Sequence, residues 1–226
     1  MDVGCGTGVF LYLLEKERNI KGIGVEIADN KIDYASTHLH VHVEKGDAGN
    51  FGFGDRSFDV VTALEVLEHL PYGVYEQALK EIARVAKSTI IISVPYKEHR
   101  SFVTCPYCKT RFNPSYHLRS FREEHMAGLF PGFVIDKIEK IGVAYAHLTW
   151  LTKTILFWKK DRMPSEFRCP ACGYSRPPQK VYGNNLRQNA HSFRTMTILR
   201  FLGSLLPKKK KARWLVAVYK LMGDYK

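Results

Sequence analysis

Residues 1–10, MDVGCGTGVF, place glycine at every second position from Gly4 to Gly8. Glycine at such a turn takes positive φ and lets the backbone approach a ligand, and the helix that follows offers free N–H groups. The dinucleotide fingerprint requires a further glycine at position 9, where this chain has Val9. The loop therefore predicts a ligand-binding turn and disfavours a nicotinamide cofactor.

A glycine loop of this kind normally follows a buried strand, yet only residues 1–3 precede Gly4. We therefore expect the chain to lack most of its first strand; whether a longer native chain supplies the rest is left open. Whether this shorter chain is active is left open.

Strand and helix patterns alternate through residues 1–95. Strands are expected within 21–27, 41–48, 57–64 and 88–95, and helices within 9–19, 29–39 and 75–87. The helix at 29–39 is expected to start from Asp29 or Asn30 as its N-cap. A helix at 121–130, a strand at 132–142 and a last strand at 212–221, for which a helix is the alternative, complete the pattern. This order predicts an α/β fold, a mostly parallel Rossmann-like sheet with helices on both faces and an antiparallel last strand.

Two acids follow the second and third expected strands, Glu26 in GVEI and Asp47 in GDA. In an open α/β sheet such groups line the crevice where ligands bind, and an acid after the second strand can hold ribose hydroxyls. The alternative is that both are ordinary solvated loop acids. Their position after successive strands favours the binding role.

The motifs DVGCGTG, GVEI, GDA and FDVVTALEVLEHL together resemble those of class I S-adenosylmethionine-dependent methyltransferases. The similarity covers roughly residues 1–142 and is greatest to the ubiquinone-biosynthesis type of O-methyltransferase. The resemblance implies contacts with the methionine part of the cofactor from the glycine loop and Asp2, and with the ribose from Glu26. It also implies contacts with adenine from Asp47 and the adjoining Ala48, and with the sulfonium region from Leu64 and Glu65.

Methyl transfer is an in-line displacement that depends on alignment, and a base is needed only if the acceptor loses a proton. His69 follows the fourth expected strand and is the first candidate for this base; packing or capping at a helix start is its alternative. His117, Tyr96 and His99 rank below it. Glu68 could orient His69, bind a metal, or be a plain solvated acid.

Four of the five cysteines form two Cys-Pro-x-Cys pairs, Cys105 with Cys108 and Cys169 with Cys172. Four thiolates satisfy tetrahedral Zn²⁺, and with no open position such a zinc is structural. In the expected sheet both pairs leave from the ligand-binding edge, so one zinc could tie them into a cap above the acceptor site. Redox-active pairs are the main alternative.

These features give five expected regions. They are a cofactor-binding core lacking most of strand 1 (1–95), a first zinc-knuckle insertion (96–118), a core helix and strand 6 (119–142), a second knuckle insertion or cap (143–207), and a basic turn with the final strand (208–226).

The formal net charge is +12, and four lysines run from 208 to 211. No apolar run is long enough to span a membrane, and no signal peptide begins the chain, so a cytoplasmic protein is expected. Residues 147–160, rich in tryptophan and aliphatic side chains before two lysines, leave open a peripheral contact with the inner membrane surface. Nucleic acid is disfavoured because no stacking strand or reading helix is evident. The sequence does not specify an oligomeric state.

The sequence thus predicts an S-adenosylmethionine-dependent methyltransferase with a structural zinc. Its acceptor is expected to be a small molecule or a lipid- or sugar-linked intermediate, methylated at oxygen. The alternative is a degenerate methyltransferase core that acts as a zinc-stabilised binding protein for RNA, protein or membrane.

Overall fold

The computed structural model describes residues 1–98, 100–147, 168–175 and 208–223, with side chains omitted for 143–147 and 208–211. The chain divides into two compact units. Unit 1 comprises Met1–His99, Leu118–Gly142 and Ala212–Lys226, and unit 2 comprises Arg100–His117 and Val143–Lys211.

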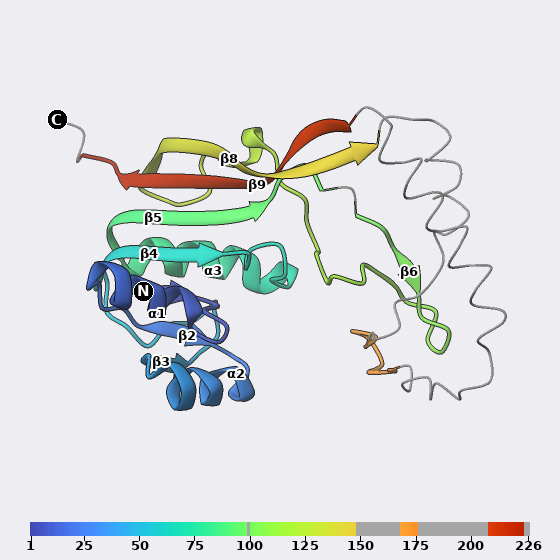
Figure 1. Cartoon of the computed structure of the whole chain (residues 1–226), viewed down its shortest axis with the longest axis horizontal. Helices are drawn as coiled ribbons and strands as arrows, with labels where there is room; N and C mark the ends of the chain where they lie inside the picture. The colour runs from blue at the N-terminus through green and yellow to red at the C-terminus, as the bar shows by residue number, and fades with distance from the viewer. Residues whose placement is uncertain (99, 148–167, 176–207, 224–226) are drawn as a thin grey trace. The chain divides into compact units, whose positions relative to one another are not determined.

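Unit 1 is built on a seven-stranded sheet of order β3-β2-β1-β4-β5-β9-β8 (Figure 1). The strands are β1 (Asp2–Val3), β2 (Gly24–Glu26), β3 (Val43–Lys45), β4 (Phe58–Leu64), β5 (Ala86–Pro95), β8 (Phe133–His147) and β9 (Lys208–Leu221). β1 to β5 pair in parallel, whereas β9 runs antiparallel to β5. The expected mostly parallel Rossmann-like sheet with an antiparallel last strand is confirmed, and residues 212–221 form a strand rather than a helix.

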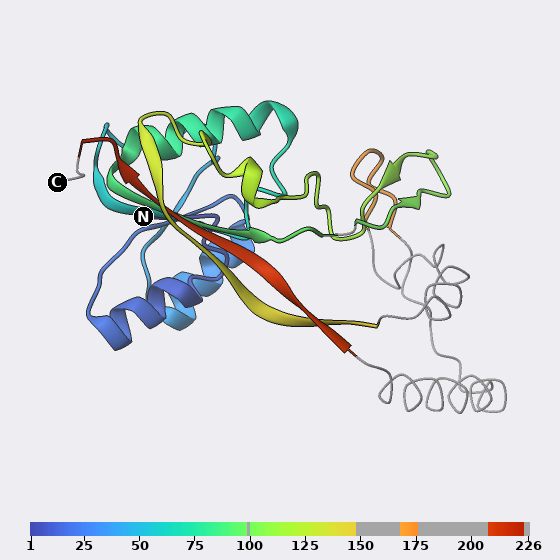
Figure 2. The ribbon, with the colours of Figure 1, turned by 90° about the horizontal axis from the view of Figure 1, so that it is seen from above.

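Helices cover both faces of this sheet. α1 (Val9–Arg18) and α2 (Asp29–Tyr34), which continues as the π-helix η1 (Ala35–Leu39), lie on one face, and α3 (Tyr72–Val85) lies on the other (Figure 2). α3 buries Ala78, Ile82 and Val85, whose spacing puts them on one side of a helix. No helix that the structure describes combines the length and the apolar character needed to cross a membrane.

The core of unit 1 lies around the central strands. β5 buries Ile90, Ile92 and Val94, and β9 buries Leu215, Ala217 and Tyr219. Because β5 is paired on both sides, its backbone hydrogen bonds are satisfied within the sheet. The carboxyl end of β5 thus lies in a strand that is paired on both sides and packed in the core of unit 1.

The helix expected at 121–130 is wrong. Only Glu123–His125 is helical, as a single 3-10 turn η2. Phe121 instead forms a parallel bridge with Tyr96, and Gly128 and Gly132 take positive φ, which breaks a continuous helix. This segment packs as an irregular connection into β8.

The expected N-cap of α2 is also wrong by one residue. The cap is Ala28, and Asp29 lies in the first turn, where its carboxylate pairs with Lys45. The Glu26 carboxylate accepts the N–H groups of Ile27 and Ala28, which precede the first turn, and no side chain caps α2.

The described part of unit 2 contains a small two-stranded antiparallel sheet, β6 (Val103–Thr104) with β7 (Arg111–Phe112). Its buried cluster consists of Val103, Cys105, Phe112 and Cys169. The aromatic and aliphatic stretch at 148–160, with its predicted membrane contact, lies outside the described residues.

Candidate functional site

The glycine loop joins β1 to α1. Gly4, Gly6 and Gly8 have φ of 64°, 59° and 79°, a region that side chains disfavour. A Cβ on Gly4 would lie 2.6 Å from a methyl carbon of Val66, whereas a Cβ on Gly6 would meet nothing within 4 Å. The backbone at Gly6 therefore borders open space in which a ligand can approach.

Glu26 ends β2 and faces the glycine loop. Its Oε2 accepts the N–H of Gly6 at 2.9 Å, and its Oε1 accepts the N–H groups of Ile27 at 3.0 Å and Ala28 at 3.1 Å. The side chain is buried, and the Lys31 ammonium lies 3.6 Å from Oε2. The structure thus brings the predicted ribose-binding acid into contact with the predicted methionine-binding loop.

Asp2 is buried beneath the loop. The Thr62 hydroxyl of β4 donates a hydrogen bond to its Oδ1, and burial raises the pKa of Asp2 to about 6. Asp2 begins β1, where its backbone pairs with Gly24 of β2 and Thr62 of β4, and the Thr62 hydroxyl holds its side chain.

Asp47 lies in the turn after β3 and is exposed. Its Oδ1 accepts the N–H of Gly49 at 2.7 Å, which closes a tight turn beside Ala48. The turn thus presents the two predicted adenine contacts, Asp47 and Ala48, at the end of the strand next to β2.

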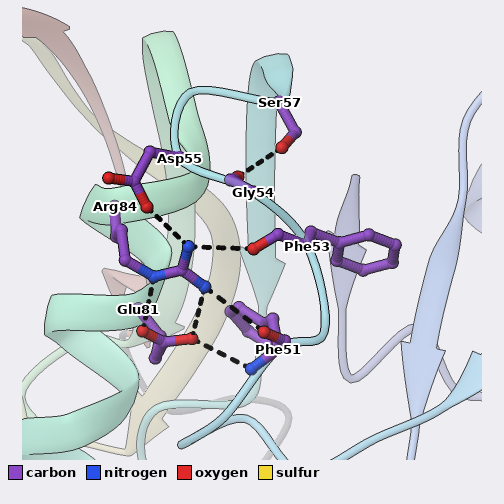
Figure 3. A network of polar contacts seen from close by, with 7 residues as sticks. All are labelled: Phe51, Phe53, Gly54, Asp55, Ser57, Glu81 and Arg84. Atoms are coloured by element: carbon purple, nitrogen blue, oxygen red, sulfur yellow. Dashed lines mark hydrogen bonds and ion pairs between the residues drawn. The ribbon is translucent and has the colours of Figure 1, made fainter.

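The loop that follows this turn is anchored by Arg84 of α3 (Figure 3). The guanidinium donates to the carbonyls of Phe51 and Phe53 and to the Asp55 carboxylate, at 3.3, 2.8 and 2.7 Å. Glu81 completes the network, since it pairs with Arg84 and accepts the N–H of Phe51 at 2.9 Å. These contacts raise the pKa of Arg84 and lower that of Glu81. Sequence reasoning missed both residues because they lie on a helix remote from every motif.

Glu65 follows Leu64 at the carboxyl end of β4 and takes φ +57°. Ser93 of β5 donates its hydroxyl to Oε1, and Trp214 of β9 donates its indole N–H to Oε2, each at 2.8 Å. Donors from two further strands therefore hold this carboxylate. Neither Ser93 nor Trp214 was identified from the sequence, although a final antiparallel strand has to start at this edge.

Glu68 lies in the turn between β4 and α3 and is fully buried. Its two carboxylate oxygens hydrogen-bond to no residue in the described part of the chain. Burial is the main reason that the pKa of Glu68 rises to about 8, and the charges of Glu65 and Glu98 add to the rise. The alternative of a solvated acid is therefore wrong.

His69 is next in this turn, before the start of α3, and its side chain is 42% exposed. Its Nε2 lies 4.0 Å from Glu68 Oε1. The turn is fixed by Arg119, which donates to the carbonyls of Leu67 and Leu70 and whose guanidinium carbon lies 4.0 Å from the ring centre of Tyr75.

The lower-ranked candidates for a base differ in their surroundings. Tyr96 is buried and donates its hydroxyl to Glu123 at 2.8 Å, so this hydroxyl is already engaged. His117 belongs to unit 2, where its backbone N–H, not its ring, donates to the Asn113 side-chain oxygen. His99 lies outside the described residues.

The two cysteine knuckles of unit 2 share one backbone design. In the first, the N–H of Cys105 is donated to the Thr110 carbonyl and the N–H of Lys109 to the Cys105 carbonyl. The second repeats both bonds with Cys169, Tyr174 and Gly173. Lys109 and Gly173, each directly after the second cysteine of its pair, both take positive φ, at 61° and 71°. The knuckles are thus equivalent loops that present their sulfurs in the same way.

The four sulfurs converge. Sγ of Cys105 lies 3.8 Å from Sγ of Cys172, Sγ of Cys108 lies 3.5 Å from Sγ of Cys169, and all four are within 4.8 Å of one another. Tetrahedral Zn²⁺ with Zn–S bonds of about 2.3 Å sets neighbouring sulfurs about 3.8 Å apart, so the donor set and its size fit this ion. Hydrogen bonds within the cluster shift the thiols in opposite directions: Thr110 is the main cause that lowers the pKa of Cys108 to about 6, whereas the pKa of Cys172 is raised.

Comparisons with known proteins agree with this geometry. Residues 1–89 match the family model of a methyltransferase domain. A demethylmenaquinone methyltransferase of Lactobacillus johnsonii is 33% identical over 96 residues, which are 38% of this chain and 38% of that protein. A ubiquinone biosynthesis O-methyltransferase of Coxiella burnetii is 33% identical over 76 residues, 31% of this chain and 32% of that protein. The matches therefore span well under half of these relatives.

Solved structures show the same fold. A protein described as a SAM dependent methyltransferase from Archaeoglobus fulgidus has a TM-score of 0.53 at 20% identity, covering 97% of this chain and 84% of that one. The protein PH0226 of Pyrococcus horikoshii has a TM-score of 0.51 at 24% identity, covering 62% of this chain and 75% of that one.

Proposed function

We propose that this chain, whose residues 1–89 match a methyltransferase domain, transfers a methyl group from S-adenosylmethionine to an oxygen of a small-molecule or lipid- or sugar-linked acceptor. One observation carries the proposal: the buried Glu26 carboxylate at the end of β2 contacts the backbone of Gly6. Ribose hydroxyls can donate to the same carboxylate oxygens while the open side of the glycine loop receives the methionine part.

The cofactor contacts follow from these positions. Glu26 would bind the ribose, the turn at Asp47 and Ala48 would bind adenine, and the loop from Gly4 to Gly8 would surround the methionine part beside Asp2. S-adenosylmethionine supplies an electrophilic methyl group, and the protein's task is to align the acceptor with it.

His69 is our proposed proton acceptor for a hydroxyl on the substrate. Its ring is partly exposed, so a substrate can reach it, and the buried Glu68 lies beside it. Neutral imidazole suits proton removal near neutral pH.

In unit 2 we propose a structural Zn²⁺ held by Cys105, Cys108, Cys169 and Cys172. The proposal is supported by the convergence of four sulfurs from two equivalent knuckles. With four thiolates the ion has no open position, so its contribution is to the folding of unit 2 rather than to methyl transfer. Cellular location and contact with a membrane surface stay predictions of the sequence.

The test is a calorimetric titration with S-adenosylhomocysteine, the product form of the cofactor. We expect the native chain to bind it and the Glu26→Ala variant to bind at least about tenfold more weakly, a loss of about 1.4 kcal/mol. Glu44→Ala is the matched control, because Glu44 lies on the adjoining strand β3 and is exposed. No binding by the native chain, or equal loss in both variants, would contradict the proposal.

A further inference from the structure

We propose that unit 2 binds single-stranded RNA on an aromatic-basic surface formed by Arg100, Phe102, Tyr107 and Arg111. The phosphates of the strand pair with the guanidinium groups, and its bases stack on the exposed rings. This interaction does not rest on the proposed function, because every residue that it uses belongs to unit 2.

The charge of the chain is divided unevenly between the two units. Unit 2 contains 17 lysines and arginines and 2 acids, whereas unit 1 contains 17 and 20. The formal net charge is therefore +15 for unit 2 and −3 for unit 1, which together give the +12 of the chain. Four thiolates with one Zn²⁺ add −2, so unit 2 keeps +13 when the zinc site is filled. A surplus of this size favours a partner with many negative charges.

The described part of unit 2 presents some of these charges at one ring. Residues 100–117 and 168–175 contain four lysines and arginines and no Asp or Glu, so these ranges supply no carboxylate of their own to offset the cations. The guanidinium carbon of Arg111 lies 5.0 Å from the ring centre of Phe102, and that of Arg100 lies 5.6 Å from the same centre. Two cations and an aromatic ring thus form one group.

The two-stranded sheet turns this group outward. Val103 of β6 and Phe112 of β7 form a cross-strand pair and are buried in the same cluster as the cysteines. Because side chains alternate between the two faces of a strand, the other pair, Thr104 and Arg111, lies on the opposite face, and both residues are exposed. Phe102, directly before β6, is 36% exposed.

A second ring stands at the tip of the first knuckle. Tyr107 lies between Cys105 and Cys108 and is 76% exposed. Its ring stacks on that of Tyr174 in the second knuckle, with the ring centres 6.1 Å apart and the planes 3° from parallel. One face of the Tyr107 ring is therefore supported and the other is open. Any base can stack on such a face, since every base has a π-face.

The exposed apolar side chains favour RNA over an anionic membrane, the other extended partner that a basic surface fits. A protein that lies on a membrane buries the apolar face of an amphipathic helix. In residues 100–117 and 168–175 the large exposed apolar side chains are all aromatic, and none lies on a helix; they are Phe102, Tyr107 and Tyr116. Rings beside guanidinium groups are instead what the splayed bases of single-stranded RNA stack on. The sequence shows no stacking strand, because the exposure of these rings depends on how the knuckles fold.

A hollow of about 300 Å³ beside the second knuckle adds a further cation. Its lining consists of Tyr116, Arg168, Cys169, Pro170 and Gly173. The Tyr116 hydroxyl donates to the Arg168 carbonyl at 2.7 Å and accepts the Arg168 N–H at 3.0 Å, so this wall of the hollow is fixed. Arg168 thus brings a positive charge to a concave site that suits one phosphate group of the strand.

The test measures binding of a labelled oligouridine strand, which forms no base pairs of its own, to the zinc-loaded protein by fluorescence anisotropy. A strand of equal length with the sugar-phosphate backbone but no bases is the second probe, and vesicles of phosphatidylglycerol and phosphatidylcholine are the third. At low salt the native protein should bind the RNA with a Kd of roughly 1 μM and the strand without bases about tenfold more weakly.

Two variants separate the roles of charge and ring. Arg111→Gln should weaken RNA binding several-fold and reduce the slope of log Kd against log salt by about 0.7, the loss of one phosphate contact. Tyr107→Ala should weaken RNA binding about tenfold, with the salt slope and the affinity for the strand without bases unchanged. Zinc content equal to that of the native protein shows that the knuckles are intact in each variant.

The matched controls lie in unit 1. Arg122→Gln replaces an arginine whose side chain is 58% exposed, and Tyr34→Ala replaces a tyrosine that is 45% exposed. Neither should change the Kd for RNA or the salt slope. Losses equal to those of Arg111→Gln and Tyr107→Ala would overturn the assignment to unit 2.

Failure of the native protein to bind RNA at low salt would overturn the proposal, and so would binding to the vesicles without binding to RNA. Equal affinity for the strands with and without bases would overturn it as well. This last comparison uses the native protein alone, so it decides the proposal even where a variant loses its zinc. None of these measurements includes S-adenosylmethionine, so their outcome is independent of the proposed function.

Discussion

The glycine loop of unit 1 and the cysteine knuckles of unit 2 are held by different forces. The loop is fixed by a parallel sheet and by a core that includes Ile90, Ile92, Leu215 and Tyr219. Among the described residues, the knuckles share a buried cluster of four, two of them the proposed ligands Cys105 and Cys169. A site built on a sheet edge tolerates the loss of one contact, whereas a cluster this small depends on the ion that joins its parts.

Removal of the zinc gives the largest expected effect. A Cys105→Ser change, or a strong chelator, should unfold the described part of unit 2, because structural zinc contributes roughly 10 kcal/mol or more to small domains. Amide hydrogen exchange should then show loss of protection at β6 and β7, while β4 and β5 stay protected. Metal analysis of the native protein should give one zinc per chain.

Cys5→Ser is the control, since Cys5 lies in the glycine loop and outside the cluster. Four freely titratable thiols in the native protein, with little zinc, would rule out the metal site.

The proposed base gives the next largest effect. His69→Gln should lower kcat by about 100- to 10,000-fold, the usual contribution of a general base, and leave S-adenosylhomocysteine binding nearly unchanged. Steady-state rates with an identified acceptor provide the measurement. His42→Gln, on an exposed histidine before β3, serves as the control. If kcat is preserved in His69→Gln, the residue has only a packing role.

Loss of the Arg84 network should weaken cofactor binding, because Arg84 anchors the loop that follows the proposed adenine-binding turn at Asp47 and Ala48. Arg84→Met keeps the aliphatic stem but removes the guanidinium and its hydrogen bonds to Glu81, Phe53, Asp55 and Phe51. We therefore expect stability to fall by about 1–3 kcal/mol and S-adenosylhomocysteine to bind several-fold more weakly. Denaturant unfolding and calorimetry report the two effects. Arg18→Met, at the exposed end of α1, should change neither, and an equal effect there would remove the special role of Arg84.

The buried Glu68 predicts a pH dependence of stability. Its pKa is raised from 4.5 to about 8, so the native state holds this proton more tightly than the unfolded chain does. Unfolding free energy should therefore fall as the pH rises through this window. The Glu68→Gln variant should not show this pH dependence. Above the raised pKa, its free energy of unfolding should exceed that of the native protein by roughly 1–3 kcal/mol. Parallel pH profiles of the two proteins would contradict the assignment.

The smallest effect compares the two knuckles with each other. Lys109 takes the positive φ that Gly173 takes in the second knuckle. Gly173→Ala should destabilise the zinc-loaded protein by about 1 kcal/mol, and Lys109→Gly should change stability by less than that, because relief of strain is offset by the entropy of glycine. Thermal unfolding with bound zinc measures both. Equal losses in the two variants would show that the loops are not equivalent.

Much of unit 1 was predictable because its signals are local. The glycines, Glu26 and the alternation of strands and helices each belong to short motifs whose spacing fixes the local structure. The helix expected at 121–130 failed because Phe121 pairs with Tyr96 across the chain, a tertiary contact that overrides local periodicity.

The supports of the site were not predictable in the same way. Trp214 and Glu65 are 149 residues apart in the sequence, a separation that no local motif covers. Arg84 binds backbone carbonyls, which every residue carries, so the identity of the loop residues does not predict the contact. Glu68 is buried because of how its turn packs, and Arg119 holds that turn. The residues next to Glu68 in the sequence do not predict this burial.

Methyl transfer itself is tested most directly by incubating the protein with S-adenosylmethionine that is radiolabelled in the methyl group, together with a cell extract. The account predicts label in a small molecule or in a lipid- or sugar-linked fraction, with the label lost in the Glu26→Ala variant. Bound cofactor without any transfer of label would contradict it and would favour a zinc-stabilised binding protein.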